Sequence, residues 1–107
     1  MKIAIAAEGP NSGSALATVF GRCPYLLLVD TEKQHFVPHG NPGRGASEGS
    51  GLMAARLVVN RGAKVLIAPK VGRLAQGVLD RAGLRVHIRQ GGTAAAALDA
   101  FVRKESA

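Results

Sequence analysis

The pattern of short apolar runs most strongly constrains the fold of this chain. Residues 2–7, 25–30 and 35–38 are rich in apolar and β-branched residues and are bounded by Gly, Pro, Asn or charged residues, which is typical of β-strands. Only residues 31–34 separate the second run from the third. Because so short a connection joins antiparallel neighbours, these two runs are predicted to form a hairpin.

The rest of the chain alternates between helix-like and strand-like patterns. Strands and helices are expected there in the order helix 47–61, strand 64–68, helix 73–82, strand 84–88 and a helix after Thr93. Ser47 is expected to cap the first helix. The second helix is expected to bury a stripe of Leu74, Ala75, Val78 and Leu79. Since strand–helix–strand crossovers give parallel pairing, the order predicts a mixed α/β sheet whose parallel part is covered by helices.

Composition favours a basic, single-domain protein with an anionic partner. A chain of 107 residues, 47% of them hydrophobic, is expected to fold as one domain spanning 1–107. The 14 Lys and Arg against 7 Asp and Glu give a net charge of +7. Cys23 is the single cysteine, which excludes an internal disulfide and suits a reducing compartment. The first apolar stretch stops at Glu8, too early for a signal peptide, and no run approaches a membrane span, so a cytoplasmic location without membrane contact is expected.

Three polar, glycine-rich loops are predicted to meet at one edge of the sheet. They are residues 8–24, 39–46 and 69–72, and each follows a strand that runs in the same direction. Ligands of open α/β sheets bind at such an edge, and the positive ends of the next two helices would face it. The loops and the helix start that follows the last of them supply the polar residues Arg22, Cys23, His39, Asn41, Arg44, Lys70 and Arg73. An anion site is therefore predicted here.

Cys23 and His39 are the predicted metal ligands at this edge. One thiol and one imidazole among several cations suit an iron–sulfur type ligand better than Mg²⁺, which requires carboxylates. Each residue also has an ordinary interpretation. Cys23 has no second cysteine at metal-binding spacing and could be a small buried filler, and His39 could be a solvated loop residue. Phe20 is expected to anchor its loop by packing.

Several segments resemble the dinitrogenase iron-molybdenum cofactor biosynthesis family, over almost the whole chain. The resemblance is carried by residues 1–6, Asp30, Asn41-Pro42, residues 49–51, 54–55 and 62–67, and above all by Phe20-Gly21-Arg22-Cys23-Pro24-Tyr25. Phe20-Gly21-Arg22 matches the family's arginine-phenylalanine-glycine-arginine type motif, from which Val19 departs at the first position. Gly72-Arg73 stands where the family usually has glycine-proline, which adds a cation.

The resemblance implies a ribonuclease H-like, five-stranded mixed sheet in the order 3-2-1-4-5 with about three helices. It also implies that the chain is not an enzyme but binds and transfers an anionic iron–sulfur or iron–molybdenum type cofactor during metallocluster biosynthesis for nitrogen fixation. Its partners would then be cluster-assembly or nitrogenase-type proteins. Together with the loop positions, this gives a predicted cofactor site of Phe20, Gly21, Arg22, Cys23, His39, Asn41, Lys70 and Arg73.

Two other functions are compatible with parts of the sequence. A nucleic-acid-binding or regulatory interaction module of the same fold would use the net charge of +7, but an aromatic content of 4% provides little surface for base stacking. A nuclease would require clustered carboxylates, whereas Glu8 stands alone near the predicted site. An enzyme with Cys23 as nucleophile and Arg22 as activating cation is the third interpretation, with no evident Cys–His pair to support it.

Overall fold

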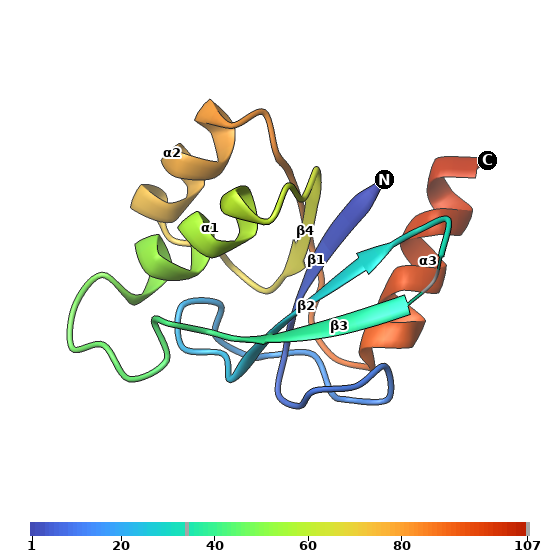
Figure 1. Cartoon of the computed structure of the whole chain (residues 1–107), viewed down its shortest axis with the longest axis horizontal. Helices are drawn as coiled ribbons and strands as arrows, with labels where there is room; N and C mark the ends of the chain where they lie inside the picture. The colour runs from blue at the N-terminus through green and yellow to red at the C-terminus, as the bar shows by residue number, and fades with distance from the viewer. Residues whose placement is uncertain (34, 107) are drawn as a thin grey trace.

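The part of the chain that the structure describes forms one five-stranded sheet with three helices (Figure 1). The structure is a computed structural model, and it describes residues 1–33 and 35–106, the side chains of 105 and 106 excepted. The elements follow one another as β1 (Lys2–Ala7), β2 (Tyr25–Asp30), β3 (His35–Gly40), α1 (Ser50–Asn60), β4 (Val65–Ala68), α2 (Arg73–Arg81), β5 (Arg85–Ile88) and α3 (Ala94–Ser106). None of the described helices is long and apolar enough to cross a membrane.

The sheet has the strand order β3-β2-β1-β4-β5, which confirms the predicted topology. β2 pairs antiparallel with both β1 and β3, and β4 pairs parallel with both β1 and β5. β1, β3 and β4 therefore run in the same direction, and their carboxyl ends lie at one edge of the sheet. As predicted, the loops after these three strands leave from that shared edge.

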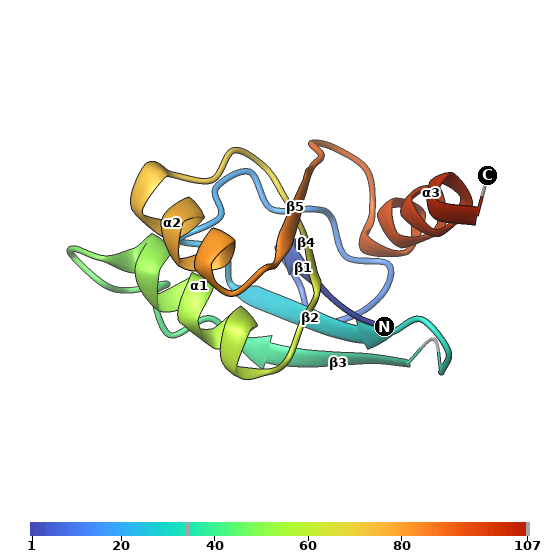
Figure 2. The same ribbon diagram turned by 90° about the horizontal axis from the view of Figure 1, so that it is seen from above.

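Each face of the sheet carries its own apolar core because strand side chains alternate between the two faces. The face with Ala4, Leu26 and Leu66 packs with buried residues of α1 and α2, whereas the face with Ile5, Leu27 and Ile67 packs with residues of α3. Figure 2 shows α1 and α2 on one side of the strands and α3 on the other. Helices thus pack against both faces of the sheet, so the edges of the sheet and the loops at its strand ends are the places accessible to a ligand.

Three local predictions were wrong. β3 continues to Gly40 instead of ending at Pro38. α1 starts at Ser50, after Gly49 in the left-handed region with a φ of 72°, so Ser47 lies in the preceding loop and caps nothing. Leu74 is 72% exposed, because the buried stripe of α2 follows Ala75 and Leu79 and a helix turns by about 100° per residue.

Candidate functional site

A surface hollow of about 430 Å³ lies between the loop before β2 and the starts of α1 and α2. We call it the helix-end hollow. It is lined by residues 19–22, 49–52, Lys70 and 72–75. Residues 19–22 follow β1 along the chain, and Lys70 follows β4. α1 connects β3 to β4, and α2 connects β4 to β5. The parallel pairing of β1 with β4 therefore brings these distant segments to one place.

Two helix N-termini contribute to the helix-end hollow. Gly49 precedes α1 and Gly72 precedes α2, and neither helix has a side-chain cap or an acidic residue in its first turn. The first N–H groups of a helix have no partner within the helix and carry the positive end of its dipole. Because Ser50, Gly51, Arg73 and Leu74 line the hollow, both helix starts favour an anion there.

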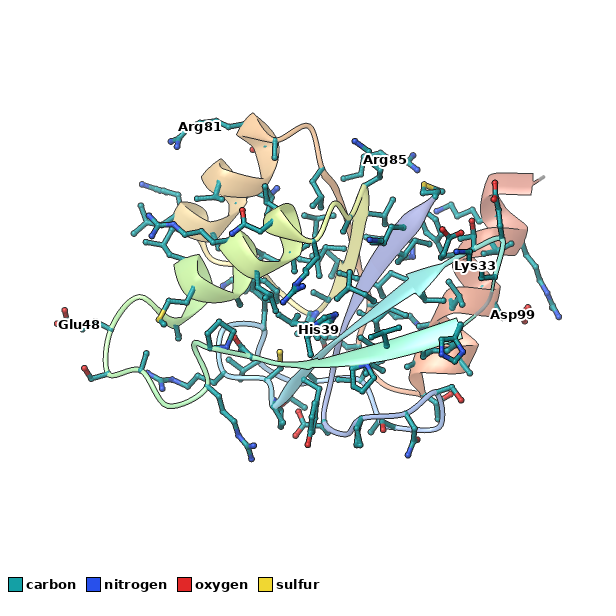
Figure 3. The ribbon with its side chains drawn as sticks, in the orientation of Figure 1. Lys33, His39, Glu48, Arg81, Arg85 and Asp99 are labelled. Atoms are coloured by element: carbon teal, nitrogen blue, oxygen red, sulfur yellow. The ribbon has the colours of Figure 1, made fainter. Side chains whose placement is uncertain are left out.

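Three exposed cations reinforce that positive potential. Arg22, Lys70 and Arg73 all line the helix-end hollow, and none of its lining residues is acidic. Arg22 is held in place because its Nη1 donates a hydrogen bond of 2.8 Å to the carbonyl oxygen of Ala46. Glu48, on the loop before α1, points outward from the molecule (Figure 3). The hollow thus offers donors and positive charge to a ligand that accepts hydrogen bonds.

The glycine of the Phe-Gly-Arg segment allows its loop to lie directly against α1. A Cβ atom on Gly21 would be 2.7 Å from Oγ of Ser50 and 2.8 Å from the backbone nitrogen of Gly51. Real side chains do not approach so closely, so any other residue would push the loop away from the start of α1. Phe20 is buried and anchors the same loop in the core, as predicted. Phe20 and Gly21 therefore set the position of Arg22.

Asn41 ties two loops together, one of which lines the helix-end hollow. It is 6% exposed. Its Nδ2 donates to the carbonyl oxygens of Gly21 and Cys23 at 2.9 Å each, and its Oδ1 accepts from the backbone N–H of Gly43 at 2.8 Å. Asn41 was predicted to bind the cofactor, and the structure places it in contact with these loop atoms and not among the residues that line the hollow.

Cys23 is buried away from the helix-end hollow. It is 1% exposed, and Nδ2 of Asn41 lies 3.6 Å from its Sγ. Burial raises the pKa of the Cys23 thiol to about 11, against a smaller lowering by Asn41, so the thiol is protonated at neutral pH. Metal ligation requires the thiolate. Coordination by Cys23 thus remains a prediction from the sequence, and in this conformation it would need both exposure and deprotonation.

His39 lines a different hollow. Because β3 continues to Gly40, His39 is a strand residue paired with Leu26, and it does not line the helix-end hollow. Burial, followed by the charges of Arg61 and Lys2, lowers the pKa of His39. We call this second space of about 430 Å³ the β3 hollow; it is lined by Lys2, residues 28–30, Lys33, His35, Val37, His39 and Arg61.

The predicted site therefore divides into three groups. Phe20, Gly21, Arg22, Lys70 and Arg73 line the helix-end hollow, whereas Cys23 and Asn41 are buried outside its lining and His39 lines the β3 hollow. Arg22 and Lys70 thus share one hollow, and Cys23 and His39 do not line it. Within residues 1–33 and 35–106, no three His, Cys, Asp or Glu side chains are grouped so that they could hold a metal ion.

Ser50 and Gly51, which line the helix-end hollow, were not predicted as site residues because the helix was expected to start at Ser47. The apolar part of the rim was not predicted either. Val19 is exposed beside Arg22, and Leu74 is exposed beside Arg73. Neither residue carries a signal for binding by itself, because single exposed apolar residues are common.

The raised pKa of Cys23 gives a prediction for alkaline stability. The unfolded chain releases the thiol proton near the ordinary value of 9.0, before the folded chain does, so the stability contributed by the neutral thiol is present below that pH and lost towards pH 11. Between about pH 8 and pH 11, we expect the free energy of unfolding of the unmodified chain to fall by about 2 kcal/mol more than that of Cys23→Ala. Urea unfolding at each pH measures this difference. If the free energy of unfolding falls equally with pH in the two proteins, burial does not raise the pKa of Cys23.

Comparisons with known proteins place the chain among cofactor-associated domains. The model of the family described as dinitrogenase iron-molybdenum cofactor matches residues 1–104. The apo form of the orange protein from Desulfovibrio gigas is similar, with a TM-score of 0.91 and 30% identity over 96% of this chain and 88% of that protein. A Thermotoga protein solved by NMR and provisionally described as a NifB protein of the DUF35 family has a TM-score of 0.82 and 33% identity, covering 95% and 87%. No curated protein sequence matches at a comparable level.

Proposed function

The chain belongs to the dinitrogenase iron-molybdenum cofactor family, and we propose that its helix-end hollow binds an anionic iron–sulfur or iron–molybdenum type cluster as transferable cargo. The observation that carries this proposal is the convergence of Arg22, Lys70 and Arg73 with the uncapped starts of α1 and α2. A multiply charged anion interacts favourably with all five groups at once.

The chemistry of the hollow supports binding by charge and hydrogen bonds. Guanidinium, ammonium and backbone N–H groups are donors only, and they match the sulfur or oxygen atoms on the surface of an anionic cluster. The lining residues contain no thiol, imidazole or carboxylate that would bond to iron. A cargo held without metal–protein bonds is released without breaking any, which suits a carrier.

The exposed apolar rim supports transfer to a recipient protein. Val19 and Leu74 lie on the rim beside the cations. Transfer requires the recipient to approach the cargo, and apolar contacts at the rim would hold the two proteins together while the charges hold the cluster. The partners would be cluster-assembly or nitrogenase-type proteins, as the family suggests.

Anaerobic titration with a synthetic anionic iron–sulfur cluster, followed by gel filtration, metal analysis and absorption spectroscopy, tests the proposal. We expect binding to weaken at least about tenfold when salt rises from about 50 mM to about 500 mM, because the cations are exposed and their field is screened. Binding that does not respond to salt would contradict a site built on charge. No retention of iron at low salt would refute cluster binding itself.

Cys23→Ala distinguishes charge from coordination in the same titration. We expect the affinity of this variant to stay within about twofold of the unmodified chain, with an unchanged absorption spectrum, because the thiol is buried and protonated. An altered spectrum together with weaker binding would mean that Cys23 bonds to iron. Arg44→Ala is a suitable control for handling losses, since Arg44 is exposed and does not line the hollow.

A further inference from the structure

The β3 hollow lies on an uncovered part of the sheet. Leu28 and Val37, paired across β2 and β3, contribute apolar side chains to its lining, and Val37 is 43% exposed. α1 packs on the same face of the sheet beside it, with Leu28 in the core that α1 covers. The hollow therefore combines an apolar floor with an open side.

Cations from separate elements surround this floor. Lys2 begins β1, Lys33 lies on the turn before β3, and Arg61 follows the end of α1. Figure 3 shows Lys33 at the turn end of β3 and His39 further along the strand. Nζ of Lys2 donates a hydrogen bond of 2.9 Å to the carbonyl oxygen of Arg61, which fixes the two residues next to each other. These charges are brought together by the fold and not by sequence proximity.

The lining contains one carboxylate, Asp30, and it already has partners. Its Oδ1 accepts a hydrogen bond of 2.9 Å from the backbone N–H of Glu32 and lies 3.8 Å from the N-terminal ammonium group. Among the side chains that the structure describes, no carboxylate forms an ion pair with Lys2, Lys33 or Arg61. The charges of Lys33 and Lys2 act on Asp30 without forming an ion pair, and the three cations outnumber the one anion of the lining.

We propose that the β3 hollow binds small organic phosphate monoesters. A phosphoryl group accepts hydrogen bonds on three oxygens and carries nearly two negative charges near pH 7, which suits Lys2, Lys33 and Arg61. The apolar part of the ester would cover Leu28 and Val37. A volume of about 430 Å³ lies within the range of sites for small ligands. This site is separate from the helix-end hollow and does not depend on cluster binding.

An NMR titration of the ¹⁵N-labelled chain with phenyl phosphate at constant ionic strength tests the proposal. We expect saturable shifts of the amide signals of Lys2, Val37, His39 and Arg61. Inorganic phosphate is expected to bind several-fold more weakly because it leaves the apolar floor uncovered. Equal affinities for the two probes, or shifts that grow without saturation over all basic residues, would overturn the proposal.

A pair of matched variants locates the site. We expect the double variant Lys33→Gln, Arg61→Gln to bind phenyl phosphate at least about tenfold more weakly than the unmodified chain. Lys70→Gln with Arg73→Gln removes the same charge from the helix-end hollow and is expected to leave this binding unchanged. The dispersion of the amide spectrum verifies folding in each protein. An equal loss of affinity for phenyl phosphate in the two double variants would overturn the proposal. A short oligonucleotide without a terminal phosphate is the second probe. Tighter binding of this oligonucleotide than of phenyl phosphate, seen at the Val37 amide, would also overturn the proposal.

Discussion

We expect the triple variant Arg22→Gln, Lys70→Gln, Arg73→Gln to bind an anionic iron–sulfur cluster at least about 100-fold more weakly than the unmodified chain. Each charge-assisted hydrogen bond to the cluster contributes about 1–3 kcal/mol, so the loss of three leaves only the two helix starts. Anaerobic equilibrium titration measures the effect. Each single variant is expected to lose about 1–3 kcal/mol of binding free energy.

Arg56→Gln, Lys64→Gln, Arg81→Gln is the matched control for that experiment. These residues are exposed and line neither hollow, yet their replacement changes the net charge by the same amount. We expect the control triple to weaken binding less than about threefold at moderate salt, because distant charges are screened. If both triple variants lose the same affinity, binding depends on overall charge and the helix-end hollow has no special role.

Asn41→Leu is expected to lower the free energy of unfolding by about 2–4 kcal/mol. The substitution removes the partner of the partly buried carbonyl oxygen of Gly21, the buried carbonyl oxygen of Cys23 and the N–H of Gly43. Urea unfolding followed by circular dichroism measures it. Because these contacts hold the loop that carries Arg22, cluster binding is expected to weaken as well, even where the variant is fully folded.

Asn11→Leu provides the comparison for Asn41. Oδ1 of Asn11 accepts from the backbone N–H of Gly13 at 3.1 Å, much as Asn41 accepts from Gly43, but Asn11 is exposed. Water replaces an exposed hydrogen bond, so a loss below about 1 kcal/mol is expected. Similar losses in the two variants would mean that burial of Asn41 contributes nothing to its effect.

Most of the fold could be predicted because its determinants are local. The runs at 2–7 and 25–30 are short and apolar, and the short stretch of sequence between the second and third runs leaves only an antiparallel pairing for β2 and β3. The crossovers through α1 and α2 then set the parallel half of the sheet. The exposed position of Leu74 was missed because apolar spacing alone does not tell which of two neighbouring residues faces the core at a helix end.

Only part of the candidate site could be predicted from the sequence, and the reason differs from residue to residue. Arg22, Lys70 and Arg73 were predictable because they follow strands whose carboxyl ends meet at one edge. His39 was expected in a loop, but β3 extends two residues further than predicted and includes it. As a strand residue, His39 lines the β3 hollow and not the helix-end hollow. Cys23 is buried in contact with Asn41, 18 residues further along the chain, and no local pattern reveals that contact.

The location of a bound cluster tests the proposed function most directly. An iron–sulfur cluster is paramagnetic or readily made so, and it broadens the amide signals of the residues nearest to it in the ¹H–¹⁵N spectrum. If the cluster binds in the helix-end hollow, broadening is strongest at residues 20–22, 50–52 and 72–75, which line it. Broadening centred on Val37 and His39 instead, with the signals of Gly51 and Arg73 unaffected, would contradict the proposed function.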